Sequence, residues 1–177
     1  MDRALLDSSL SQLPIFQYEY IKTSELTFSD NARYICETEC PMYGKTWACP
    51  PAVGSVDSCT KKCLSYDDAI IVTTVSEVGD ITNMEETLST RAGHEEVIAQ
   101  VKDLVSMQHP DTFVLSTEAC AICETCTYPD APCRYPDKMF PCVESHGILV
   151  TDIAEKYDIS FYNGSNIVTW FSVIFYR

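Results

Sequence analysis

The sequence has few basic residues and no long apolar run. Its 177 residues include 12 Lys and Arg against 26 Asp and Glu, which gives a formal net charge of −14. Phosphate binding needs clustered Lys and Arg, so we expect no nucleic acid partner. The most apolar segment, residues 167–176, is about half as long as the ~20 residues that a membrane helix needs. We therefore expect no membrane span.

Signals for export and for nucleotide binding are also missing. Residues 1–10 contain two Asp and no apolar stretch of signal-peptide length, and the sequence begins with Met1. Neither a G-x-G-x-x-G run nor a P-loop occurs. We expect a cytoplasmic protein, in which ten cysteines indicate metal or redox chemistry rather than disulfides. A secreted disulfide-rich protein without its signal peptide is the alternative.

The apolar content of 46 % suits a single folded domain over residues 1–177. Interleaved helices and strands, with a final pair that resembles a hairpin, predict an α+β fold. We expect a mixed or antiparallel sheet covered by two main helices, with two cysteine-rich metal-binding loops at 31–54 and 118–141. Residues 1–30 should contribute an N-terminal strand or hairpin.

The apolar pattern also gives the individual elements. Regular structure is not expected inside 31–54, which is rich in Pro and Gly. Asn83 can cap a long helix whose weak point is Gly93, and Gly147 is the weak point of a second helix. The expected helices are 57–67, capped by Ser55 or Asp57, then 83–107 and 142–157, and the expected strands are 15–26, 69–75, 112–116, 159–162 and 167–176.

The densest cysteine group follows the strand expected at 112–116. Two residues separate Cys120 from Cys123 and Cys123 from Cys126, and Cys133 follows after six intervening residues, directly after Pro132. A C-x2-C-x2-C run wraps the backbone around a cubane so that successive thiolates reach different irons, as in bacterial ferredoxins. In ferredoxins the fourth cysteine follows sooner and precedes a proline. The spacing predicts a 4Fe-4S cluster with Cys133 as the expected fourth ligand.

Zinc is the main alternative for this group. A four-cysteine zinc site usually pairs two C-x2-C knuckles that are well separated in the sequence. Here three cysteines share one run and no second knuckle occurs. Zinc is therefore possible but is geometrically less natural than a cluster.

The first cysteine group in the chain lies in the loop expected at 31–54, and the C-x2-C-x2-C group is the second. Cys36, Cys40 and Cys49 are spaced by three and eight residues, a pattern that differs from common ferredoxin, zinc and radical S-adenosylmethionine motifs. Cys59 or Cys63 could be a fourth ligand, although their spacing of four also fits one buried helix face. If only three cysteines bind, one metal position is open to a substrate or partner.

The remaining cysteine and the histidines are less informative. Cys142 is expected to be a small buried residue, and a Cys142/His146 metal pair is the alternative. His94 and His109 stand in polar surroundings, and we expect both to be exposed rather than ligating.

Basic and acidic residues flank both cysteine groups. Arg134 beside the second group and Lys45 within the first can offset the charge of an anionic cluster or hydrogen-bond its sulfurs. Lys138 is equally suited to a surface role. Glu37, Glu39 and Glu124 would act in the opposite direction and favour a low reduction potential.

These motifs resemble a prokaryotic family described only as predicted metal-binding proteins, a cysteine-rich domain of unknown function. The resemblance extends over about residues 30–176, and it implies seven metal-ligand candidates while bringing no established reaction. It leaves Cys59, Cys63 and Cys142 as extras of this chain. The shared features are Cys36-x3-Cys40-Pro41, Tyr43-Gly44-Lys45, Cys49-Pro50-Pro51, Cys120-x2-Cys123-x2-Cys126, Pro132-Cys133-Arg134, Pro136 and the segment 144–150.

The leading hypothesis is a cytoplasmic iron–sulfur protein that transfers single electrons to or within a partner redox enzyme. One cubane is expected on Cys120, Cys123, Cys126 and Cys133, and a second metal site on Cys36, Cys40 and Cys49. Two alternatives remain open. One is an interaction module stabilised by zinc, and the other is an enzyme with an open-site cluster at the three-cysteine group.

Overall fold

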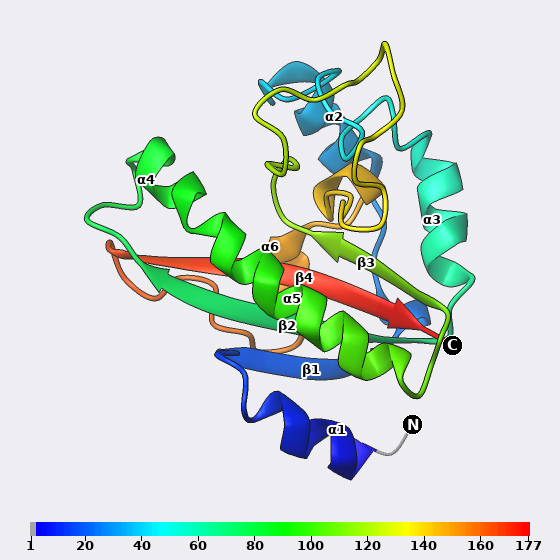
Figure 1. Ribbon diagram of the computed structural model, residues 1–177, viewed down its shortest axis with the longest axis vertical. Helices are drawn as coiled ribbons and strands as arrows, with labels where there is room; N and C mark the ends of the chain where they lie inside the picture. The colour runs from blue at the N-terminus through cyan, green and yellow to red at the C-terminus, as the bar shows by residue number, and fades with distance from the viewer. Residues whose placement is uncertain (1–2) are drawn as a thin grey trace.

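The computed structural model describes residues 3–177, and within them four strands form one antiparallel sheet (Figure 1). The strand order is β1-β2-β4-β3, and every neighbouring pair is antiparallel. The α+β class and the antiparallel alternative are therefore confirmed. The strands are β1 (Gln17–Lys22), β2 (Asp68–Glu77), β3 (Thr112–Ser116) and β4 (Ile167–Tyr176).

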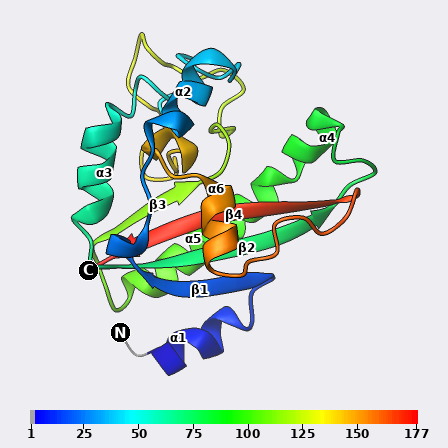
Figure 2. The ribbon, with the colours of Figure 1, turned by 180° about the vertical axis from the view of Figure 1, so that it is seen from behind.

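Helices lie on both faces of this sheet. Alternate residues of a strand point to opposite faces, so Ala69 and Ile71 of β2 enter one core while Ile70 and Val72 enter the other. The first core also contains residues of α3 (Val56–Leu64) and α6 (Val150–Lys156), and the second contains residues of α1 (Arg3–Leu10) and α5 (Arg91–Ser106). Figures 1 and 2 show α5 and α6 crossing opposite faces of the sheet.

The helix predicted at 83–107 is two helices, and its break is not at Gly93. Asn83 caps α4 (Met84–Ser89) by accepting a hydrogen bond from the amide of Glu86, as expected. The chain then breaks at Thr90, whose hydroxyl donates to the carbonyl of Thr87 and accepts from Trp170 Nε1. Trp170 belongs to β4, so a tertiary contact fixes the position of the break.

The prediction of a second long helix at 142–157 is wrong. A 3₁₀ turn, η2 (Glu144–His146), ends at Gly147, and α6 begins only at Val150. Gly147 has φ +80°, and a Cβ there would lie 3.0 Å from Val56 Cγ1 and 3.2 Å from the carbonyl oxygen of Ser29. The left-handed backbone and this close approach leave room only for glycine. The expected weak point is therefore a turn between two elements.

Two further expectations are corrected. Residues 31–54 contain a helix, α2 (Asp30–Thr38), which Ser29 caps by accepting from the amide of Asn31. Residues 159–162 form no strand and no hairpin, because the amides of Ile159 and Ser160 donate to the carbonyl of Ala154 and to the side chain of Gln17. The final strand β4 pairs with β2 and β3 instead.

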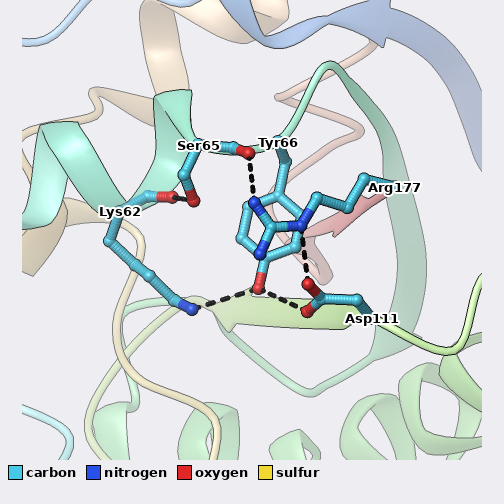
Figure 3. Close-up of polar contacts among 5 residues, drawn as sticks. All are labelled: Lys62, Ser65, Tyr66, Asp111 and Arg177. Carbon is cyan, nitrogen blue, oxygen red and sulfur yellow. Dashed lines mark hydrogen bonds and ion pairs between the residues drawn. The ribbon is translucent and has the colours of Figure 1, made fainter.

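A network of polar contacts holds the C-terminal residue against α3 and the turn before β3 (Figure 3). Arg177 Nε pairs with Asp111 at 2.6 Å, and its NH1 donates to the carbonyl of Ser65 at 2.8 Å. The buried Tyr66 donates to Asp111 at 3.1 Å and accepts from Lys62 at 3.1 Å. These bonds fix the end of the sheet at which the chain passes from α3 into β2.

The helices within residues 3–177 include none with both the length and the apolar character needed to cross a bilayer. The longest, α5, has 16 residues and carries charged side chains.

Candidate metal centre

The second cysteine group lies where β3 leaves the sheet. Between Glu118 and Pro141 the chain forms no helix or strand, and this segment lies over the same end of the sheet as α2 (Figure 1). The four cysteines expected to bind a cluster line one small hollow of about 20 Å³, together with Trp47 and Arg134. They are Cys120, Cys123, Cys126 and Cys133.

The first cysteine group lines a different and larger cavity. Cys36 lies near the end of α2, Cys40 follows that helix, and Cys49 lies in the irregular segment before α3. All three line a cavity of about 220 Å³. The same cavity is also lined by Cys142, which the sequence considered as a ligand only in a pair with His146, and by Glu118 and Glu144, which were not ligand candidates.

Acidic side chains distinguish this cavity. The Cys142 thiol donates to Glu144 Oε2 at 2.8 Å. Burial raises the pKa of Glu144, and burial together with the charge of Glu144 raises the pKa of Cys142 well above its ordinary value. Sequence reasoning missed Glu144 because nothing in its local pattern indicates that it turns into a cavity.

The two cysteine groups are electrostatic neighbours. Burial raises the pKa of Cys49, and the adjacent thiols of Cys40 and Cys120 contribute to the increase. Burial likewise raises the pKa of Cys120, to which Cys133 also contributes. Cys49 thus interacts electrostatically with thiols of both groups, so a charge on one group affects the pKa of thiols in the other.

A buried cation acts on thiols of both groups. Arg91, the first residue of α5, is 4 % exposed, and its charge lowers the pKa of both Cys49 and Cys120 against the effect of burial. Its Nε donates to the carbonyl of Thr117 at 2.9 Å, and its NH2 lies 3.0 Å from Glu95 Oε1 without an aligned hydrogen bond. Sequence reasoning missed Arg91, which has no cysteine near it in the chain.

The two basic residues proposed from the sequence both lie beside the second group. Arg134 lines the small hollow and donates through NH1 to the carbonyl of Thr125 at 2.8 Å. Lys45, although it lies within the first group in the sequence, lines an open recess with Cys120, Cys123 and Cys126. Both cations therefore accompany the same set of thiols.

The other cysteines lie elsewhere. Cys59 lines a separate cavity of about 690 Å³, and its thiol donates to the carbonyl of Val53 at 3.4 Å. Cys63 is fully buried in the core beneath α3. Their shared helix face is thus a packing face, as one of the two readings of their spacing predicts.

The exposure expected for the lone histidines is wrong. His94 is 2 % exposed. Its Nδ1 lies 2.8 Å from Thr74 Oγ1 and its Nε2 lies 2.8 Å from Ser172 Oγ, so this side chain joins α5 to the sheet. His109 is partly buried and lies against the ring of Tyr176. Both side chains are held by β-strand residues that the sequence alone cannot place beside them.

Every cysteine within residues 3–177 is a free thiol. In the same part of the chain, no three His, Cys, Asp or Glu side chains are grouped closely enough to hold a metal ion. The thiols line hollows rather than meeting at one point. A single zinc ion needs its ligand atoms about 2.0–2.3 Å from one point, whereas a cluster distributes its thiolates over several irons.

The donor chemistry of the two hollows fits a soft metal. Thiolate ligands select zinc, copper(I) or iron–sulfur clusters over magnesium and calcium. Four sulfur atoms line each hollow, and a buried or neighbouring guanidinium accompanies them. The fold and these groups define a thiol-rich α+β protein with two adjoining sets of metal-ligand candidates.

The chain belongs to the family described as predicted metal-binding protein (DUF2284), whose model matches residues 19–176. The family suggested by the cysteine motifs is thereby confirmed. Comparisons with curated proteins and with solved structures gave no match. Metal binding is the general property that the family description gives.

Proposed function

We propose that this protein is a cytoplasmic iron–sulfur protein that transfers single electrons to or within a partner redox system. The observation that carries the proposal is the common hollow lined by the four cysteines of the C-x2-C-x2-C group and its partner (Cys120, Cys123, Cys126 and Cys133). An iron–sulfur cluster bound there would supply one-electron redox chemistry.

Two sites close together suit a relay better than an isolated centre. Cys49 and Cys120 interact electrostatically although they belong to different groups. A second cluster on Cys36, Cys40 and Cys49 would therefore lie beside the first, and the reduction of one would oppose the reduction of the other. Such coupling is expected to separate the two potentials.

The protein's own residues would tune these potentials. Arg91 and Arg134 bring positive charge to the thiols, and Lys45 borders the same region. Positive charge stabilises the more negative, reduced state of a cluster and so raises its potential. Glu118 and Glu144 line the first cavity and would lower the potential there. We therefore expect the first site to have the lower potential.

Anaerobic metal and sulfide analysis tests the proposal. The protein purified without oxygen should be brown and should contain several irons and acid-labile sulfides per chain. Cys123→Ser should lose the iron of one cluster, whereas Cys63→Ser, outside both hollows, should retain it. A colourless protein with stoichiometric zinc and no sulfide would overturn the iron–sulfur assignment.

Zinc is the second candidate, and the size of the hollow favours it at the second group. About 20 Å³ accommodates little more than one water-sized sphere, which suits one ion unless the segment opens. In that case the thiolates would stabilise the fold and form an interaction module. Such a protein would unfold on chelation and would show no redox activity.

A further inference from the structure

We propose that Cys142 is the fourth thiolate of the first cysteine group, so that Cys36, Cys40, Cys49 and Cys142 form one closed metal site. This inference rests on the proposed metal-binding function and completes it. Sequence reasoning assigned three ligands to this group and left the fourth position undetermined, either occupied by Cys59 or Cys63 or open. A fourth thiolate from a distant segment closes that position.

The position of Cys142 carries the argument. It lies more than ninety residues after Cys49 in the chain, yet both side chains line the cavity of about 220 Å³. Its amide donates to the carbonyl of Ala48, the residue before Cys49, at 3.1 Å. This hydrogen bond joins the two segments directly at the cavity wall.

The backbone around Cys142 is fixed by the sheet. Cys142 forms an isolated parallel bridge with Ser116, the last residue of β3. The amide of Ser116 donates to the carbonyl of Pro141, and the amide of Val143 donates to the carbonyl of Ser116. A ligand held by such a network keeps its position when a metal enters or leaves, which is the usual requirement for a precise site.

The other candidates for a fourth ligand do not reach this cavity. Cys59 lines the separate cavity beside Trp47, and Cys63 lies in the core beneath α3. Within residues 3–177, the cysteines lining the first cavity are the three of the motif and Cys142. The carboxylates of Glu118 and Glu144 also line it, but sulfur is the donor that a soft metal prefers.

A closed site changes the function expected of this group. Catalytic metal sites keep one position free for water or substrate, whereas closed sites serve structure or electron transfer. With four thiolates, the first site favours an electron carrier over an enzyme with an open-site cluster. Its acidic lining then acts on the potential of that carrier.

Metal stoichiometry and alkylation of the full chain under anaerobic conditions test the assignment. We compare wild type with Cys142→Ala and Cys142→Ser after reconstitution with iron and sulfide, and Cys59→Ser is the matched control on the other cavity. The Cys142 variants should lose the iron and sulfide of one cluster and one electron paramagnetic resonance signal of the reduced protein. Cys59→Ser should retain both.

Alkylation of the wild-type protein tests the assignment without depending on the folding of any variant. In the metal-loaded wild-type protein, mass spectrometry should find Cys142 protected from a thiol reagent together with Cys36, Cys40 and Cys49. Metal removal should increase the alkylation rate of all four together. Rapid modification of Cys142 while the three motif cysteines remain protected would overturn the assignment.

The outcomes separate this inference from the proposed function. If wild type binds zinc and no iron, the iron–sulfur function fails, and loss of one zinc per chain in Cys142→Ala still supports the ligand. If wild type contains iron and sulfide and Cys142→Ala keeps all of it, the function stands and the ligand assignment fails. If wild type binds neither metal, both are wrong.

Discussion

Arg91 Nε donates to the carbonyl of Thr117 at 2.9 Å, which fixes the beginning of α5 to the chain just as it leaves β3. The same buried guanidinium lies beside Glu95 and influences thiols of both cysteine groups. One residue therefore serves the fold and the proposed site together. This dual position leads to the first prediction.

Replacement of Arg91 by alanine should strongly destabilise the protein. It would leave the Glu95 carboxylate, 18 % exposed, without its cation, and breaking a buried pair typically costs about 3–5 kcal/mol. Arg91→Lys keeps the charge, so it should lose less stability than Arg91→Ala. It should still be less stable than wild type, because lysine cannot reproduce the guanidinium geometry. Urea unfolding followed by circular dichroism measures the difference. Equal stability of all three proteins would contradict the role of this pair.

Acidification should weaken the fold through His94. Burial, with a contribution from Arg91, lowers the pKa of His94 from 6.5 to about 3. Between pH 6.5 and about 3 the unfolded chain binds a proton at His94 that the folded protein does not bind, so stability falls as the pH falls. The slope attributable to one such group is up to about 1.4 kcal/mol per pH unit.

A comparison of wild type with His94→Gln isolates this effect. The variant cannot take up the proton, so its free energy of unfolding should depend less steeply on pH between 6.5 and 5. Its stability at pH 7 should be lower, because the contacts with Thr74 and Ser172 are disturbed. Parallel pH profiles for the two proteins would disprove the assignment to His94.

Two glycines should respond in opposite directions to alanine. Gly147→Ala places a Cβ on a left-handed backbone and against Val56 and Ser29, so it should lose at least about 1–2 kcal/mol. Gly93 lies inside α5, where a Cβ would meet nothing within 4 Å. Gly93→Ala should therefore gain about 0.5–1 kcal/mol. Thermal unfolding measures both, and shifts of the same sign would contradict the backbone assignment.

Tyr66 should matter more through its ring than through its hydroxyl. Tyr66 is 1 % exposed and its ring contacts the rings of Phe113 and Phe175, so Tyr66→Ala should cost about 3–5 kcal/mol. Tyr66→Phe removes only the contacts with Lys62 and Asp111 that Figure 3 shows, and should cost much less. Chemical unfolding of the two variants compares them directly. Similar losses would assign the stabilisation to the polar network instead.

Local patterns were sufficient for most of the sheet. The β-branched run 69–75 and the segment TFVLS identified β2 and β3, and Asn83 marked the true beginning of α4. Each of these signals is contained in a few adjacent residues, since backbone propensity and capping act over one or two turns. Predictions that depended on distant contacts were wrong. The helix predicted at 142–157, for example, is interrupted at Gly147, which closely approaches Val56 and Ser29.

Part of the candidate metal site could also be predicted from local sequence. The C-x2-C-x2-C run predicts that its thiols share one hollow because a short loop cannot separate them, and the structure places all four cysteines of that group in one lining. The roles of Arg91 and Cys142 had no such signal. Both reach the site from segments that lie far away in the sequence and that the end of β3 brings beside it.

The sequence by itself determined the class of fold, the family and the candidate sulfur donors, because each follows from residue types at short spacing. Only the tertiary structure decided that Cys142 lines the cavity of the first cysteine group, and which charges act on the thiols. The pairing of β3 with β4 carries residues 118–142 to the segment around Cys49, and no pattern along the chain encodes a contact between segments that far apart.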